Sequence, residues 1–239
     1  MKLICVSTGS KKGNSYILQA SDGKCIALDC GATYKAIEAA SGYRPYDIEF
    51  ALATHGHEDH SYAIPQIIHH GIDVFSNADV VDKFPGVKCL GKNKTANLCG
   101  WKVTPFEVPH TNGDGSECQN YAYIIERDGE RLLYMTDWMY CRYKLSKFRI
   151  NHFLIAVNYT DLEEEDSEGK IAHVVSGHAS LDTVKDFLKA SMTDDCRSVV
   201  ACHLSERNAD KSVILRELNE IAQGTVNVAI AERGHTYEL

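Results

Sequence analysis

The sequence has 239 residues, of which 33 are acidic and 25 are basic, so its formal net charge is −8. With 44% hydrophobic and 24% charged residues, the composition is that of an ordinary globular protein, which excludes collagen-like, coiled-coil and intrinsically disordered chains. The negative charge excludes a protein that binds nucleic acid through bulk positive charge, but it is compatible with a local basic site.

The sequence indicates neither a membrane span nor a targeting segment. No apolar run approaches the roughly 20 residues that cross a bilayer, and the apolar stretch in the opening MKLICVSTGSKKGNS is too short for a signal peptide. Nine cysteines, an odd number without a Cys-x-x-Cys pair, do not suggest a disulfide framework. We therefore expect a cytoplasmic protein with reduced thiols and no membrane partner, forming one domain over residues 1–239.

Short β-rich runs alternate with helical patterns along the chain. The turn signals Asp22-Gly23 and Asp128-Gly129 predict two hairpins. The pattern predicts strands at 3–7, 15–20, 25–29, 48–53, 73–76, 101–108, 120–126, 131–136, 152–158, 198–203, 225–230 and 235–239, and helices at 33–41, 60–70, 180–190 and 209–222. This alternation predicts an α/β (α+β) protein in which two sheets are sandwiched between helices.

Four side chains of metal-ligand type follow the apolar strand predicted at 48–53. They are His55, His57, Asp59 and His60, in the string ALATHGHEDH. Residues two apart in extended backbone point the same way, so the first two histidines can bind one ion together. Imidazole and carboxylate groups are ligands for zinc and related transition metals. The segment therefore predicts a metal site rather than a solvated polar turn.

The string HGHEDH is the His-x-His-x-Asp-His motif of the metallo-β-lactamase superfamily, and the resemblance continues in order along the chain. LDCG, with Asp29 and Gly31, resembles the family's early aspartate–glycine turn. VPHTNGD, MTDW and ACHLS then supply His110, Asp137 and His203, each after a predicted strand. The resemblance implies the four-layer αββα sandwich of that family.

The resemblance also implies two divalent metal ions. The first would be bound by His55, His57 and His110, the second by Asp59, His60 and His203, and Asp137 would bridge the two. Seven ligands are too many for one tetrahedral ion but suit a pair that shares a carboxylate. The histidine-rich set favours zinc, and manganese is compatible with it. Asp59 also belongs to the expected catalytic set.

Further motifs resemble the phosphodiesterase branch of the superfamily, which includes ribonuclease Z and small bacterial exonucleases of the YycJ type. SGHAS supplies His178, which by this resemblance protonates the leaving oxygen. HLSERN supplies Ser205 and Asn208, and VNYT supplies Asn158, as candidate substrate-binding residues; loop structure is the alternative for the first two. The opening VSTGSKKGNSYIL resembles the Gly-Ser-x-Gly-Asn start of the small exonucleases. This chain departs from that group at Ala156-Val157, where Glu-Ala is usual.

A basic run, CRYKLSKFRI at 141–150, follows the expected bridging aspartate. Its cations alternate with aromatic residues, a pattern that can bind a phosphate backbone while rings stack on bases. Arg142 and Lys144 are therefore candidate substrate-binding residues. A solvated helix face is the alternative interpretation.

These residues predict a two-metal hydrolase of phosphodiester bonds, with DNA or RNA exonuclease as the leading hypothesis. The resemblance implies that a metal-bridging hydroxide attacks phosphorus while His178 acts as general acid. The nearest competing hypothesis is a phosphodiesterase for a small cyclic or signalling nucleotide, which the acidic charge favours slightly. A lactonase or thioesterase acting at carbon is less favoured, and a non-catalytic metal-binding module is the least favoured.

Overall fold

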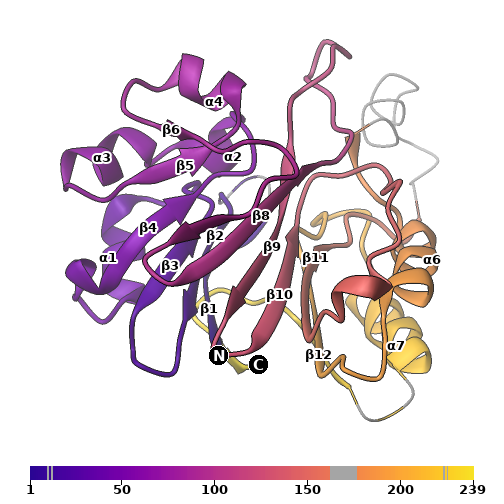
Figure 1. Ribbon diagram of the computed structural model, residues 1–239. Coiled ribbons are helices and arrows are strands. Elements are labelled where there is room, and N and C mark those ends of the chain that lie inside the picture. Colours follow the sequence, from indigo (N-terminus) through magenta and orange to yellow (C-terminus); the bar gives the residue numbers. More distant parts are fainter. Residues whose placement is uncertain (10, 12, 162–176, 223, 225) are drawn as a thin grey trace.

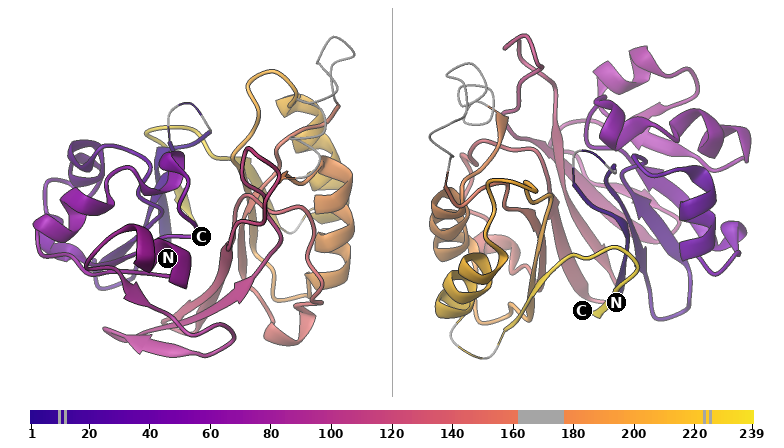
Figure 2. Two further views of the ribbon diagram at one scale, coloured as in Figure 1. Left: turned by 90° about the horizontal axis from the view of Figure 1, so that it is seen from above. Right: turned by 180° about the vertical axis from the view of Figure 1, so that it is seen from behind.

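Two β-sheets face each other between two layers of helices in the computed structural model of the protein (Figure 1). The structure describes residues 1–9, 11, 13–161, 177–222, 224 and 226–239. Seen from above, α1, α3 and α4 cover the outer face of one sheet, and α6 and α7 cover the outer face of the other (Figure 2). This is the four-layer αββα sandwich that the sequence predicted.

The first sheet is built mainly from the first third of the chain. Its strands in spatial order are β14 (Thr236–Glu238), β1 (Lys2–Ser7), β2 (Ser15–Gln19), β3 (Cys25–Leu28), β4 (Ile48–Leu52), β5 (Val74–Ser76) and β6 (Lys88–Cys89). Pairing is antiparallel from β14 to β3 and parallel from β3 to β6. Because β14 pairs with β1, the two ends of the chain lie side by side (Figures 1 and 2).

The second sheet takes the rest of the chain. Its strands in spatial order are β13 (Asn227–Ile230), β12 (Ser198–Cys202), β11 (His152–Ala156), β10 (Glu130–Met135), β9 (Tyr121–Arg127), β8 (Trp101–Glu107) and β7 (Ala96–Leu98). The strands β10 to β13 are parallel, and the rest are antiparallel. The predicted hairpin between β9 and β10 is confirmed, since Asp128 and Gly129 both have positive φ (55° and 79°), as a type I′ turn requires.

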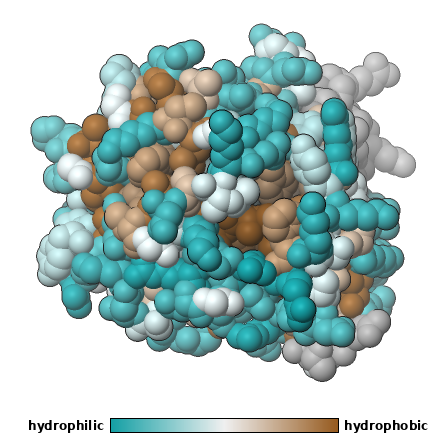
Figure 3. Space-filling view, viewed as in Figure 1, coloured by the Kyte–Doolittle hydropathy of each residue, from teal (hydrophilic) through white to brown (hydrophobic). Residues whose placement is uncertain are grey.

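The helices other than α2 pack on the sheets through an apolar face, whereas the buried residues of α2 are His60 and Ser61. The helices are α1 (Tyr34–Ala40), α2 (Glu58–Ser61), α3 (Ile64–His69), α4 (Ala78–Lys83), α6 (Leu181–Ser191) and α7 (Lys211–Ala222). The α6 helix begins after Ser180, whose hydroxyl accepts a hydrogen bond from Thr183 N, and it buries Leu181, Val184 and Leu188. None of the described helices is long and apolar enough to cross a membrane. The face of the molecule drawn in Figure 3 is mainly hydrophilic.

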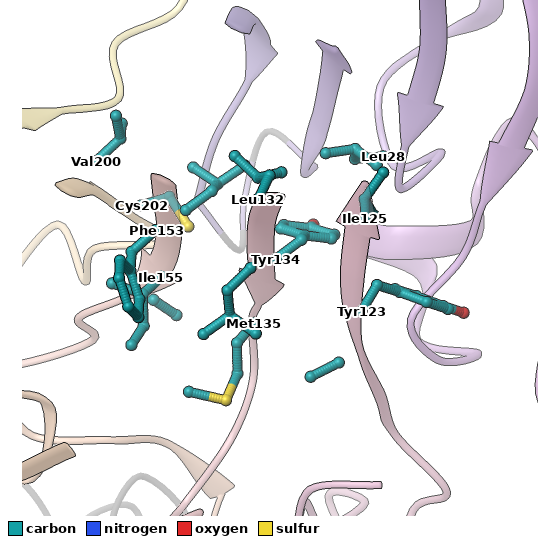
Figure 4. Close-up of a cluster of buried hydrophobic side chains, with 14 of the residues drawn as sticks. Leu28, Tyr123, Ile125, Leu132, Tyr134, Met135, Phe153, Ile155, Val200 and Cys202 are labelled. Carbon is teal, nitrogen blue, oxygen red and sulfur yellow. The ribbon is translucent and has the colours of Figure 1, made fainter. Parts of the chain in front are cut away.

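The first sheet separates two clusters of buried side chains. In β2, Tyr16 and Leu18 face the second sheet, whereas Ile17 faces the helices, because alternate residues of a strand point to opposite faces. The larger cluster fills the space between the sheets and continues on the outer face of the second sheet under α6 and α7; Tyr123 and Tyr134 lie in it among aliphatic side chains (Figure 4). Strand ends that project from this packed interior are held firmly, which suits them to carry a site.

Two sequence-based predictions are wrong. The helix predicted over 60–70 is divided into α2 and α3, because Pro65 lies in the first turn of α3 and its ring cannot continue a helix from the preceding turn. The alternative of a solvated helix over 141–150 also fails. That segment is irregular apart from one 3-10 turn at Ser146–Phe148, which ends where Arg149 adopts a left-handed conformation. The sequence signals also missed the short elements α4, β6 and β7.

Candidate metal centre

The polar side chains that follow the strands gather at one edge of the sandwich. His55 follows β4, and α2 carries Asp59 and His60 immediately afterwards. His110 follows β8, and Asp137 and His203 follow β10 and β12. The strands β8, β10 and β12 run in one direction within the second sheet, so their carboxyl ends share an edge. The structure therefore brings together all seven predicted ligands, in two groups of four that share Asp137.

The first group consists of three imidazoles and a carboxylate. His57 Nδ1 lies 3.0 Å from His55 Nε2 and 3.2 Å from His110 Nε2. Asp137 Oδ2 lies 3.5 Å from His55 Nε2 and 3.7 Å from His110 Nε2. Four ligand atoms around a tetrahedral ion, each about 2.1 Å from it, are separated by about 3.4 Å. The spacing in this group fits that geometry.

The second group contains two imidazoles and two carboxylates. His60 Nε2 lies 3.4 Å from Asp59 Oδ2 and 3.1 Å from Asp137 Oδ2. His203 Nε2 lies 3.6 Å from Asp59 Oδ2 and 3.1 Å from Asp137 Oδ1. The donor set and spacing of both groups fit divalent metal ions.

The outer ring nitrogens are held by protein oxygen atoms. His55 Nδ1 lies 3.0 Å from Thr54 Oγ1, and His57 Nε2 lies 3.0 Å from Asn112 Oδ1. His110 Nδ1 lies 2.7 Å from the carbonyl oxygen of Gly177. A carbonyl oxygen accepts hydrogen bonds, so His110 donates through Nδ1 and presents an unprotonated Nε2 to the first group. Such partners fix the tautomer and orientation of metal-binding histidines.

Asp29 supports the second group through the outer ring nitrogen of His60. Its buried carboxylate lies 2.7 Å from His60 Nδ1 and accepts hydrogen bonds from Thr54 N (2.7 Å) and Tyr134 Oη (2.5 Å). Asp29, Asp137 and His203 also have left-handed backbones, with φ of 55°, 47° and 52°. Non-glycine residues rarely adopt this conformation, and it clusters at functional sites. The backbone turns sharply at these strand ends and directs the side chains into the centre.

The pKa values of the histidines differ between the two groups, because burial and neighbouring charges act on them to different extents. Burial lowers the pKa of His55 well below its usual value and lowers the pKa of His110 to about 4. Burial also opposes the charged form of His60, but the carboxylates of Asp137, Asp59 and Asp29 outweigh it and raise the pKa of that histidine. For Asp137, burial favours the neutral acid, but the neighbouring imidazoles hold its pKa well below the usual range.

The N-terminal loop supports the second group through Asn14, a residue that the sequence signals did not assign to the site. Its Nδ2 donates to Asp59 Oδ2 (3.3 Å) and lies 3.1 Å from His60 Nε2, and its backbone N donates to Asp59 O (2.6 Å). The backbones of Asn14 and Asp59 both lie so close to Gly31 that a Cβ on this glycine would be 2.6 Å from Asn14 N and 1.8 Å from Asp59 O. Asn14 stands in the Gly-Asn element of the opening string, which was the available signal. Asn112, in VPHTNGD, was missed in the same way.

His178 lies beside both groups. Its Nδ1 is 3.6 Å from Asp137 Oδ1, and its ring stacks on that of His203 with centroids 5.6 Å apart. The ring centroid of His110 lies 5.4 Å away. The side chain of His178 is 14% exposed.

The predicted substrate-binding residues occupy different surroundings. Asn158 lies at the centre, with Nδ2 3.3 Å from His203 Nδ1. Ser205 Oγ accepts a hydrogen bond from Asn208 N at 3.2 Å, and Asn208 O accepts one from Thr160 N, so this pair also organises its loop. Arg142 lines a cavity beside His110, whereas Lys144 is exposed and does not line that cavity. The structure therefore places Asn158 at the centre and the exposed Arg142 in the wall of the adjoining cavity, and it leaves Lys144 at the surface.

Comparison with known proteins identifies the fold and shows similarity to metal-dependent hydrolases. A family profile described as the metallo-beta-lactamase superfamily matches residues 9–75. Over 254 aligned residues the chain is 25% identical to exodeoxyribonuclease WalJ of Streptococcus pneumoniae, covering 96% of this chain and 91% of that protein. The structure of the present chain is similar to that of YhfI of Bacillus subtilis, a metallo-beta-lactamase fold protein. The TM-score is 0.75 and the identity 12%, over 100% of this chain and 99% of that chain. The structure is also similar to that of yeast PDE1 (TM-score 0.74, 15% identity, 100% and 99% coverage). These structures show that the chain has the metallo-β-lactamase fold, and the profile of that superfamily matches the segment that carries HGHEDH.

Proposed function

We propose that the chain is a single-domain, two-metal hydrolase of phosphodiester bonds that acts on nucleic acid as an exonuclease. The main observation that supports this reaction is the pair of ligand groups that share Asp137 and lie beside His178. Similarity to an exodeoxyribonuclease over 96% of the chain supports nucleic acid as the substrate. Nine free cysteines support a reducing compartment, the cytoplasm.

The proposed ligands are those of the two groups. His55, His57 and His110 would hold one ion, Asp59, His60 and His203 would hold the other, and Asp137 would be a ligand common to both groups. A bound pair of divalent ions supplies water activation and neutralises charge on the phosphate. Zinc is preferred because imidazoles dominate the set, and manganese is the alternative.

The residues of the chain carry the remaining steps. Buried histidines and the ligand carboxylates form a preorganised, largely dry centre, so little rearrangement is needed as charge develops on the phosphate. His178 donates a proton to the leaving oxygen, which is otherwise a poor leaving group. Asn158 contacts His203 and binds the substrate phosphate from the adjoining strand end.

Metal-loaded protein should hydrolyse bis(p-nitrophenyl) phosphate and degrade end-labelled DNA from an end. His178→Ala should reduce turnover by about 100-fold or more, the usual contribution of a general acid. His69→Ala is the matched control, since His69 is an exposed histidine on α3. Unchanged turnover in His178→Ala would refute the general-acid role. Activity on lactones or thioesters without phosphodiester cleavage would refute the proposed reaction.

A phosphodiesterase for a small cyclic or signalling nucleotide is the second candidate. A cavity of about 390 Å³ beside His110 is of the size that binds small molecules, and the chain is acidic overall. Salt separates the two candidates, because polymer binding releases counterions and weakens steeply as salt increases. Small-nucleotide turnover that does not change with salt, together with no DNA degradation, would favour this candidate.

A further inference from the structure

A cavity of about 390 Å³ lies beside His110 and adjoins the candidate metal centre. Its walls come from the end of β8, the loop that carries His110, and the irregular segment 139–143. It reaches the first ligand group directly, since His110 and Thr111 are part of its lining. A group bound here is therefore adjacent to the reacting phosphate.

Two tyrosines and an arginine distinguish this cavity. Tyr140 and Tyr143 are each 42% exposed, and both line it together with Arg142. Large aromatic side chains left open to solvent beside a catalytic centre are typical of binding surfaces. Their rings offer flat apolar faces of the kind on which nucleobases stack.

The cavity wall is held in place before any ligand binds. Met139 N donates to Pro109 O at 3.0 Å, which ties the segment to the residue preceding His110. The ring of Tyr143 packs against Phe106, with centroids 5.8 Å apart and the planes at 88°. A preformed aromatic surface loses little conformational entropy on binding.

The charges of the lining favour a base with its neighbouring phosphate over a bare anion. Lys92 is paired with Glu107, and Glu117 adds a carboxylate at the rim. In the described part of the chain, Arg142 pairs with no carboxylate; its Nη2 donates to Tyr140 Oη at 3.2 Å. One available guanidinium in a lining without excess positive charge suits a single phosphate attached to an uncharged aromatic group.

On the basis of the proposed function, we propose that this cavity binds the nucleobase of the nucleotide at the scissile phosphate. The base stacks on Tyr143, and Arg142 binds the phosphate group of that nucleotide. Tyr140 restrains the guanidinium through its hydroxyl and through a cation–π contact of 5.7 Å. The cavity thereby confers a preference for nucleotide diesters over other phosphodiesters.

The test compares two chromogenic diesters with the same leaving group, thymidine 5′-p-nitrophenyl phosphate and methyl p-nitrophenyl phosphate. The measured quantity is the ratio of their kcat/KM values. We expect Tyr143→Ala to lower this ratio by about 5- to 150-fold, the cost of losing one base–aromatic stack. Tyr143→Phe should restore the ratio, since it keeps the ring. Tyr43→Ala removes a tyrosine that is 68% exposed and does not line the cavity, so it should leave the ratio unchanged.

A ratio that stays the same in Tyr143→Ala, or that changes equally in Tyr43→Ala, overturns the proposal. Binding of thymidine 5′-monophosphate, measured by calorimetry in wild-type protein and Tyr143→Ala, separates this failure from that of the proposed function. If neither diester is cleaved but the nucleotide binds through Tyr143, the proposed reaction fails and the subsite stands. If neither diester is cleaved and the nucleotide does not bind, both fail.

Discussion

The two ligand groups share Asp137 but differ in the charge around their imidazoles. In the first group, the outer ring nitrogens lie against uncharged oxygen atoms of a hydroxyl, an amide and a backbone carbonyl. In the second group, His60 lies against the buried carboxylate of Asp29, and Asp59 adds a second ligand carboxylate. The second group is therefore the more anionic of the two.

This difference indicates unequal affinities for a divalent cation. A carboxylate behind a histidine increases its basicity as a ligand, and ligand carboxylates attract the ion directly in a buried environment. Both effects favour the second group. Four observable consequences test the comparison, and the largest concerns the residue that the groups share.

Asp137→Asn should abolish the pairing of the two ions. The change removes a ligand charge from both groups, so turnover should fall by more than the roughly 10–100-fold that loss of a ligand's hydrogen-bond partner costs. Metal content per chain, measured by mass spectrometry, should fall below one ion. Asp82→Asn, on the exposed side of α4, is the control. Two ions per chain with full turnover in Asp137→Asn would refute a shared ligand.

Stepwise metal titration should show one tight and one weaker equivalent. Asp59→Asn should eliminate the tight phase and leave the weaker one, because it removes a ligand of the second group alone. His57→Ala should eliminate the weaker phase and leave the tight one. Loss of the same phase in both variants, or equal affinities in the wild type, would contradict the asymmetry.

The residues behind the ligands should have smaller effects of the same kind. Asp29→Asn should weaken the tight phase, and Asn112→Ala the weaker phase, each by about 10–100-fold. Calorimetry with each variant gives both affinities in one experiment. If Asp29→Asn weakened the phase that Asn112→Ala weakens, the assignment of these partners to separate groups would be wrong.

The position of the candidate ligands could be predicted because each motif follows an apolar run. Such runs form the interior strands of the sandwich, and parallel strands such as β10 and β12 end at one edge. The side chains of Asp137 and His203 therefore meet although 66 positions separate them in the sequence. The motif order along the chain carries this information.

The supporting residues could not be predicted because their roles depend on loops. Asn112 reaches His57 after its loop folds back through a hydrogen bond from Asn112 N to Ser116 O. Asn14 reaches Asp59 because two backbones meet at Gly31, a contact between distant segments. The cavity at Tyr143 likewise depends on how an irregular segment packs. Periodicity describes strands and helices, and it does not specify such packing.

The smallest expected effect is on thermal stability. An ion that binds the native centre at 100 times its dissociation constant adds about 2.7 kcal/mol to the free energy of unfolding. For a chain of this length, 1 kcal/mol shifts Tm by about 2–4 °C, so each ion should raise Tm by about 5–10 °C. Calorimetric scans of chelator-treated and metal-loaded protein measure the shift.

At one equivalent of metal, the asymmetry predicts that His57→Ala keeps most of this stabilisation, because its second group is intact. Asp59→Asn should lose most of it at the same metal concentration. Equal Tm values for the two variants would mean that the extra carboxylates around His60 do not strengthen metal binding.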